Sequence, residues 1–367
     1  MQLGRLPLCQ LSYSRTCPSV PDRLAALGAT PHPYGMPMLT RILLALIVLA
    51  TAIGVVVWVV RYQPFGPADP VGSPLPSTHP AAAGWSEGPQ APFARLEMAT
   101  ATLDGRIWMA GGLEADGAVS DALAIFDPVT GEWSDGPTLP VAVHHAALAS
   151  DGEHLFLIGG YLGATNAPTD DVHVFDPAAR AWEAGPPLPE PRAAGAATHD
   201  GTRIVYGGGV GQDGVRHELF ALADGSWSVI GTLTRAREHL AATTDGSGRA
   251  WFMGGRQGGL DRNVGDVDLV EGTSVGRLPS LTPRGGVAAF FAPEIGACLT
   301  GGEAPSFAYS MVECVDAEGR VSALPEMLQR RHGHGVAVID GVAYALLGGE
   351  MPGLSASATM ERLSLED

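Results

Sequence analysis

Five arginines stand at equivalent places of a repeated sequence and could bind an anionic ligand: Arg95, Arg192, Arg237, Arg284 and Arg331. A guanidinium group forms paired hydrogen bonds to carboxylate or phosphate oxygens. Glutamate and histidine side chains, which can transfer protons, follow several of these arginines closely. These further candidates are Glu97, His145, Glu238, His239, His332 and His334.

Six Gly-Gly pairs set the spacing of these candidates. The pairs lie 47 or 48 residues apart through the last two-thirds of the chain. A fixed period of this length indicates one supersecondary unit repeated around an axis. The pairs are Gly111-Gly112, Gly159-Gly160, Gly207-Gly208, Gly254-Gly255, Gly301-Gly302 and Gly348-Gly349.

Each repeat also contains the signals of four short strands. An apolar run such as Ile107 to Ala110 ends at each Gly pair, and an Asp-Gly turn such as Asp104-Gly105 precedes most of these runs. Asp-Gly between two apolar runs is a strong hairpin signal. A third strand ends in Phe126-Asp127-Pro128, and Trp133 opens a fourth. Four short strands in about 47 residues are typical of one propeller blade.

The order of Gly-Gly, Phe-Asp-Pro, Trp and Leu-Pro before an arginine resembles the Kelch repeat family over residues 85–367. The resemblance implies an all-β, six-bladed Kelch-type β-propeller with four-stranded blades. Trp85 lies 48 residues before Trp133. We therefore expect an N-terminal strand to complete the last blade, which removes an open sheet edge.

The repeat also predicts a functional face. We expect the innermost strand of each blade to begin at the arginine position, where Val143 replaces arginine in the second repeat. These positions then converge on one mouth of the central channel. The loops after the Gly pairs are expected on the same face, and the Asp-Gly hairpins on the other. In Kelch repeats an arginine at this place is common, so the alternative role is bonding to carbonyls of a neighbouring blade.

The first 84 residues have a different composition. Residues 42–60 are uncharged and apolar, lie between Arg41 and Arg61, and are long enough to span a bilayer as one helix. We predict an uncleaved anchor, with a buried helix or a cleaved signal peptide as alternatives. Arginines precede this span, which predicts a cytoplasmic segment 1–41, a Pro-rich linker 61–84 and a propeller outside the inner membrane. Met36 or Met38 is an alternative start.

The net charge of −17 narrows the classes of partner. The absence of lysine excludes lysine Schiff-base chemistry and a P-loop. An acidic domain is repelled by nucleic acid, so we expect no nucleic-acid partner. The lipid bilayer is the expected contact of the anchor.

No cofactor and no metal ion are expected. His144-His145 and His332-x-His334 would converge only if their side chains point into the channel. An acidic loop at Asp261, Asn263, Asp266 and Asp268 is expected to be solvated and not to hold calcium.

Two cysteines fall on neighbouring predicted strands of one blade. Cys298 and Cys314 are expected to form either a disulfide, in an oxidising compartment, or two small buried core residues.

Three functions compete. The first is a membrane-tethered binding module whose loop face engages a protein, peptide or glycan outside the cytoplasmic membrane. The second is a carbohydrate-active enzyme for an anionic sugar, because six-bladed Kelch proteins include the sialic acid mutarotases. The third, a copper-radical oxidase, needs a Tyr-Cys crosslink at the mouth, and both propeller cysteines are assigned elsewhere. We favour the binding module.

Overall fold

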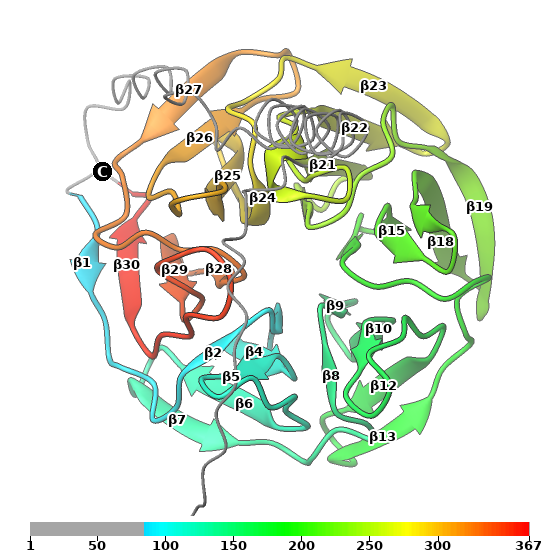
Figure 1. The fold of residues 1–367 in the computed structure, drawn as a ribbon, viewed down its shortest axis with the longest axis horizontal. Coiled ribbons are helices and arrows are strands. Elements are labelled where there is room, and N and C mark those ends of the chain that lie inside the picture. The colour runs from blue at the N-terminus through cyan, green and yellow to red at the C-terminus, as the bar shows by residue number, and fades with distance from the viewer. Residues whose placement is uncertain (1–83, 367) are drawn as a thin grey trace, which may run out of the picture. The chain divides into compact units, whose positions relative to one another are not determined.

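The computed structural model describes residues 84–366, which form six antiparallel four-stranded sheets around a central axis (Figure 1). This confirms the prediction of an all-β, six-bladed propeller. Blade 1 consists of β3 (Ala99–Leu103), β4 (Arg106–Ala110), β6 (Leu123–Asp127) and β7 (Glu132–Asp135). Blade 2 consists of β9 (Ala147–Ser150), β10 (Leu155–Ile158), β12 (Val172–Asp176) and β13 (Ala181–Ala184). Blade 3 consists of β14 (Ala196–His199), β15 (Ile204–Gly207), β18 (Glu218–Ala223) and β19 (Ser226–Thr232). Blade 4 consists of β20 (Ala241–Thr244), β21 (Arg249–Met253), β22 (Val267–Glu271) and β23 (Ser274–Leu278). Blade 5 consists of β24 (Gly285–Ala292), β25 (Gly296–Glu303), β26 (Val312–Val315) and β27 (Val321–Leu324). Blade 6 consists of β28 (Gly335–Ile339), β29 (Val342–Leu346), β30 (Met360–Ser364) and β1 (Ser86–Glu87).

The predicted anchor at residues 42–60, the N-terminal segment and most of the linker lie outside the described residues. Among residues 84–366, no helix has the length and apolar character needed to cross a membrane.

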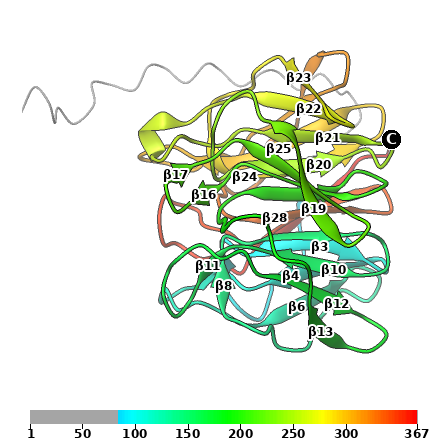
Figure 2. The same ribbon diagram turned by 90° about the vertical axis from the view of Figure 1, so that its right-hand side faces the viewer.

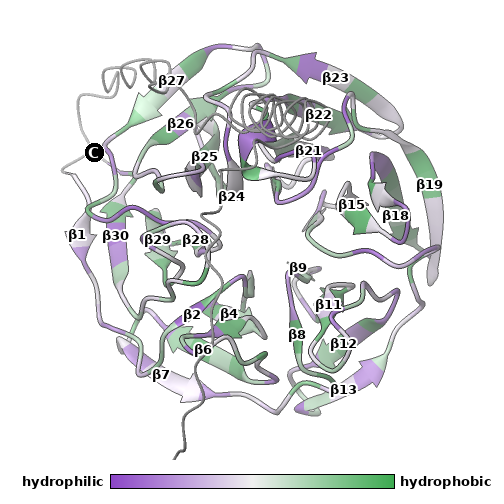
Figure 3. Ribbon diagram, viewed as in Figure 1, coloured by the Kyte–Doolittle hydropathy of each residue, from purple (hydrophilic) through white to green (hydrophobic). Residues whose placement is uncertain are grey.

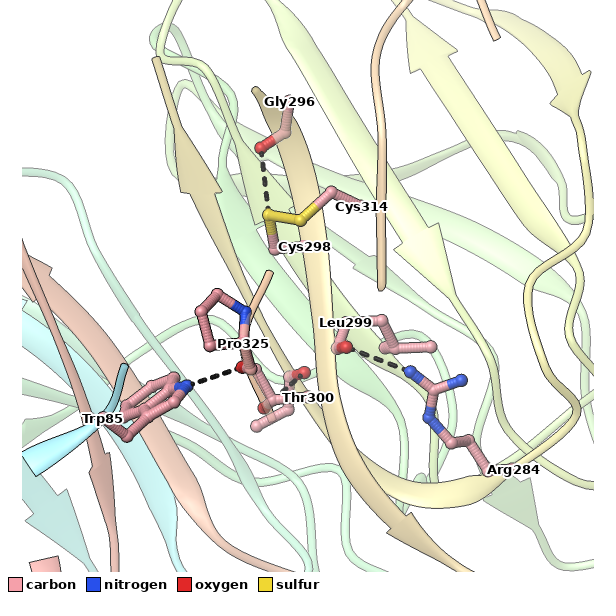
Figure 4. Close-up of a disulfide and its surroundings, with 9 residues drawn as sticks. Trp85, Arg284, Gly296, Cys298, Leu299, Thr300, Cys314 and Pro325 are labelled. Carbon is pink, nitrogen blue, oxygen red and sulfur yellow. Dashed lines mark hydrogen bonds between the residues drawn. A yellow bond between two sulfur atoms is a disulfide. The ribbon is translucent and has the colours of Figure 1, made fainter. Parts of the chain in front are cut away.

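The first described strand closes the ring. β1 pairs with β30, the third strand of the last blade, with Ser86 opposite Arg362. The indole N–H of the buried Trp85 donates to the carbonyl of Pro325, 2.9 Å away (Figure 4). Trp182 makes the same bond to Pro137 of the preceding inter-blade connection. Trp85 therefore occupies the repeat's tryptophan position in blade 6, and the two ends of the propeller share one sheet.

The core lies between neighbouring blades. Trp108 of blade 1 packs against Phe175 of blade 2, with ring centroids 5.4 Å apart, and Trp182 joins the same cluster. The outermost strands, by contrast, are largely exposed and include hydrophilic residues (Figure 3); in β7 and β13 only Trp133 and Trp182 are half-buried. The blades are therefore held together by apolar faces that water does not reach.

The Gly pairs are the points at which each blade meets the next. In blade 1 both Gly111 and Gly112 have left-handed φ, and the N–H of Gly112 donates to the carbonyl of Val143 at 2.8 Å. A Cβ atom on Gly111 would collide with that carbonyl oxygen. The equivalent bond joins every other pair of adjacent blades, with acceptors Arg192, Arg237, Arg284, Arg331 and, from Gly348 of blade 6, Arg95. The backbone of each arginine position is thus fixed by the preceding blade.

Blade 5 contains a disulfide between β25 and β26. Cys298 and Cys314 stand directly opposite each other in the register, and both are fully buried (Figure 4). The disulfide ties the second and third strands of this blade together.

The two faces of the ring differ. Short ribbons formed by β8 (Val143–His144) with β11 (Tyr161–Leu162), and by β16 (Val210–Gly211) with β17 (Gly214–Val215), project at one face (Figure 2). We call this the loop face; β2 (Arg95–Leu96) and β5 (Leu113–Glu114) form the corresponding ribbon of blade 1. The 3-10 helix η1 (Leu260–Arg262) lies in the loop after the Gly pair of blade 4. The opposite end of the channel is a cavity of about 460 Å³ bordered by hairpin residues such as Asp151 and Gly152.

The predicted start of the innermost strands is wrong by four residues in five blades. β3, for example, begins at Ala99 and not at Arg95, and only β24 begins directly after its arginine. The arginine segments therefore precede the innermost strands and cross the loop-face end of the channel. The reason is a left-handed residue in each segment, described next.

Candidate binding site at the channel mouth

The first position of five of the six segments is an arginine whose side chain turns into its own blade. Arg237 is fully buried, and its guanidinium donates to Asp268 at 2.8 Å and to the Phe252 carbonyl at 3.0 Å. Arg284 likewise donates to Glu313 and to the carbonyls of Leu299 and Gly301 (Figure 4). Charged groups are buried in proteins chiefly when they are paired. Both guanidinium groups are therefore held inside their own blades by a carboxylate and by backbone carbonyls.

The other arginines follow the same pattern with different partners. Arg331 donates to Glu361 at 2.9 Å and to two backbone carbonyls of blade 6. Arg192 pairs with Glu218 and Glu190. Arg95 is buried beside Phe93, and its nearest carboxylate is Glu114, 3.6 Å away. The structure does not bring the five side chains together at the channel.

Burial lowers the pKa of Arg284 and of Arg331, while Glu313 and Glu361 act in the opposite direction. The paired carboxylates stand on the third strands β26 and β30 and offset the loss of hydration. These pairs have the character of fixed structural contacts between strands.

The third position of each segment is left-handed in all six blades, with φ between 52° and 66°. These six residues form a closed ring of backbone hydrogen bonds around the axis, in which each N–H donates to the third-position carbonyl of the preceding blade at 2.7–3.0 Å. The ring consists of Glu97, His145, Ala194, His239, Gly286 and Gly333. The left-handed backbone ends the extended segment and directs the third side chain differently from the first.

Three of these ring residues have side chains that carry chemistry, and they meet at the loop-face mouth of the channel. One ligand atom from each of Glu97, His145 and His239 lies within 4.8 Å of the other two. Nε2 of His145 is 3.5 Å from Oε2 of Glu97. The rings of His145 and His239 stand edge to face with centroids 4.7 Å apart. All three residues line a small cavity of about 90 Å³.

A second set of charged groups adjoins these three. Arg256 donates to Glu238 at 3.0 Å, to Glu303 at 2.7 Å and to Nε2 of His239 at 2.8 Å. His332 of blade 6 lies 3.6 Å from Glu303. These contacts link blades 4, 5 and 6. We call Glu97, His145, Glu238, His239, Arg256, Glu303 and His332 the mouth cluster.

Burial sets the protonation of the two ring histidines. It lowers the pKa of His145, although the Glu97 carboxylate opposes the shift. It lowers the pKa of His239 well below the usual value, and the positive charge of Arg256 adds to the effect. Both imidazoles are therefore neutral at pH 7.

Two candidate sets from the sequence are not brought together. His332 donates its Nδ1–H to the Gly349 carbonyl, whereas His334 bonds to Thr300. The left-handed Gly333 between them separates the two side chains. The prediction that the acidic loop is solvated is wrong for two of its residues, because Asp268 is fully buried against Arg237 and the buried Asp266 pairs with Arg235.

Sequence reasoning missed Arg256 and Glu303. Each directly follows the second glycine of its Gly pair. The repeat alignment, extended by one residue beyond each pair, would have placed both on the loop face beside the ring. The contacts of Arg256 with Glu238 and with Glu303 depend on side-chain placement, which repeat spacing does not determine.

The fold and the repeated mouth define a six-bladed β-propeller built on one repeat. A family model for the Kelch motif matches residues 142–189, which cover blade 2 and the connections on either side of it. The chain is therefore a six-bladed β-propeller that contains a Kelch motif in blade 2.

A solved structure titled "Structure of YjhT" is similar to this chain. The two align with a TM-score of 0.65 over 75% of this chain and 96% of that chain, at 14% sequence identity. At this identity the likeness shows the fold alone. No curated protein matches the sequence.

Proposed function

We propose that this protein is a membrane-tethered Kelch module whose loop face engages a protein, peptide or glycan outside the cytoplasmic membrane. The observation that carries the proposal is the mouth cluster, which gathers seven ionisable side chains from five blades at one end of the channel. Binding residues concentrate on loops held by a rigid scaffold. The loops after the Gly pairs surround this cluster, so a ligand would meet both.

Two features support the tether and its orientation. The apolar residues 42–60 are followed by six prolines before residue 84, which suits an extended spacer. The Cys298–Cys314 disulfide fits an oxidising compartment. Both features agree with a propeller held on the outer side of the membrane.

The binding proposal is tested by capture of partners on the full-length protein, together with a glycan-array screen. A variant with Arg256→Gln and Glu303→Gln changes the mouth without adding bulk. A matched control, His199→Ala, changes the opposite end of the channel. We expect the mouth variant to lose the captured partners and the control to retain them. Equal capture by all three proteins would contradict the proposal.

The orientation has a separate test. Protease added to spheroplasts is expected to cleave the propeller, because the propeller is proposed to lie outside. Protection of residues 84–366 in intact spheroplasts, with cleavage only after lysis, would show the reverse orientation.

One observation favours a second candidate, an enzyme for an anionic sugar of the sialic acid mutarotase kind. Arg256 is the guanidinium at the mouth that could face a sugar carboxylate, and Glu238 and His239 adjoin it. In mutarotation a base removes the proton of the anomeric hydroxyl while an acid protonates the ring oxygen; the ring opens and closes again on the other face. Faster anomer exchange of N-acetylneuraminate, followed by NMR and lost in Arg256→Gln, would favour this candidate. Exchange at the uncatalysed rate would exclude it.

A further inference from the structure

The three ring residues Glu97, His145 and His239 have the ligand types and the spacing of a transition-metal site. Two imidazoles and one carboxylate are a common set for zinc and similar ions. Two ligand atoms bound at about 2.0–2.1 Å in tetrahedral geometry lie about 3.3 Å apart. The observed 3.5 Å between Nε2 of His145 and Oε2 of Glu97 is close to that separation. Among residues 84–366, this is the one group of three ligand side chains whose ligand atoms all lie within 4.8 Å of one another.

Hydrogen bonds hold His145 in the tautomer that a metal requires. Nε2 of His144 donates to Oδ1 of Asn166 at 2.9 Å. Nδ1 of His144 therefore carries a lone pair, which accepts the Nδ1–H of His145 at 2.6 Å. The lone pair of His145 is then on Nε2, which faces Glu97. Metal-binding histidines are oriented by hydrogen bonds of this kind at their second nitrogen.

His239 has the corresponding arrangement with a carboxylate. Its Nδ1 lies in close contact with Oε2 of Glu238. Its Nε2 lone pair accepts an N–H of Arg256. A metal ion at Nε2 would displace that N–H, and Arg256 would keep Glu238 and Glu303 as partners. Arg256 therefore competes with a metal for His239.

The charge balance at the mouth favours a cation. Glu97, Glu238 and Glu303 contribute three carboxylates, each at least four-fifths buried, and Arg256 contributes one guanidinium. The arginines of the neighbouring segments do not offset the difference, since Arg237, Arg284 and Arg331 are paired with carboxylates of their own blades. A divalent cation would balance the two excess carboxylates.

The rest of the ring leaves the ion accessible. The other three ring positions are Ala194, Gly286 and Gly333, which have no long side chain, and all three line the same small cavity. Three protein ligands with an open position is the arrangement of zinc sites that bind water or a ligand.

We propose that Glu97, His145 and His239 bind one divalent transition-metal ion of the zinc type at the loop-face mouth of the channel, with a coordination position open to the small cavity that the ring residues line. This goes beyond the binding function above, because uptake of the metal alone requires no loop-face partner.

The test is a calorimetric titration of Zn²⁺ into the full-length protein in detergent. Cys9→Ser and Cys17→Ser are present throughout, so that thiols outside the described residues do not bind zinc. We expect one bound ion. Affinity should fall at least tenfold in His145→Ala, in His239→Ala and in the near-isosteric Glu97→Gln. The control His154→Ala, at the opposite hairpin, should bind zinc as the parent does.

Two further variants separate a metal site from a general effect on structure. Arg256→Gln should bind zinc more tightly, because it removes the competing N–H and a positive charge. Asn166→Ala should weaken binding by about 10–100-fold through loss of the bond that orients His144. Circular dichroism checks that each variant is folded. The proposal is overturned if the parent binds no zinc, or if folded Glu97→Gln and His145→Ala both bind it as tightly as the parent.

Discussion

The interiors of blades 3 to 6 and the channel mouth are built from the same kinds of residue but differ in charge balance and access. In blade 5, Arg284 and Glu313 form a buried pair that is neutral as a whole, and the guanidinium has further backbone acceptors. At the mouth, three carboxylates share one guanidinium, and the ring residues beside them line a small cavity. The buried arginine–carboxylate pairs, which we call the closed pairs, join strands within a blade. The side chains at the mouth, in contrast, can still bind a ligand.

The difference arises from backbone conformation within three residues of sequence. In the segment Arg237-Glu238-His239, the first side chain enters the blade and pairs with Asp268. The third residue is left-handed, and its side chain lies at the mouth with Glu97 and His145. Position within the segment, and not residue type, separates the structural arginines from the candidate ligands.

The largest expected effect is on the closed pairs. Arg284→Ala leaves Glu313 buried without a cation and should lower the free energy of unfolding by about 3–5 kcal/mol. Arg95→Ala should cost less, because its carboxylate Glu114 is 47% exposed and stays hydrated. Chemical denaturation monitored by circular dichroism measures both. Equal losses of unfolding free energy in the two variants would contradict the distinction between the buried carboxylate of Glu313 and the hydrated carboxylate of Glu114.

A second expected effect concerns His334, which is buried in a neutral form. Burial lowers its pKa well below the usual 6.5, and Arg331, His332 and Arg284 lower it further. The unfolded chain binds a proton at a higher pH than the folded protein does, so stability should fall as pH falls below 6.5. In His334→Gln, which can still donate to Thr300, this pH dependence should be weaker. An unchanged slope of unfolding free energy against pH would assign the dependence to other groups.

A smaller effect is expected in the ring of left-handed residues. Ala194 adopts φ 54°, which disfavours a residue with a Cβ atom. Ala194→Gly should therefore raise the free energy of unfolding by about 1 kcal/mol. The same denaturation experiment measures it. A loss of stability would mean that the Ala194 side chain contributes more by packing than its backbone conformation costs.

The smallest effect on stability is expected at the mouth. His145→Ala removes an imidazole and Glu97→Gln removes a carboxylate charge, both beside a cavity, and each should change the free energy of unfolding by less than about 1 kcal/mol. Their effect should instead appear in zinc affinity. A stability loss as large as that of Arg284→Ala would make the mouth a structural element like the blade interiors.

The Gly pairs made the architecture predictable because the backbone itself requires them. Glycine is needed where one blade approaches the next, as at Gly111, so the repeat count and the closure by Trp85 could be read from the sequence. The roles of the repeated arginines could not be predicted from the sequence. Their partners, such as Asp268 and Glu361, lie on third strands, and such contacts depend on register and on side-chain direction.

The proposed metal ligands could not be predicted from the sequence for a related reason. In the sequence, adjacent histidines such as His144 and His145 form the obvious candidate pairs. In the structure, His145 instead lies beside Glu97 and beside His239, which is two blades away. That combination follows from the left-handed third position shared by all blades. No local motif marks it, because each blade contributes one residue.

The central claim is that the ring side chains at the mouth, and not the repeated arginines, form the site at which this propeller binds a ligand. Its most direct test is an anomalous difference map at the zinc edge from a crystal of the zinc-loaded protein. We predict one peak within bonding distance of Glu97, His145 and His239. A peak elsewhere, or no peak at the mouth in crystals that contain zinc, would contradict the claim.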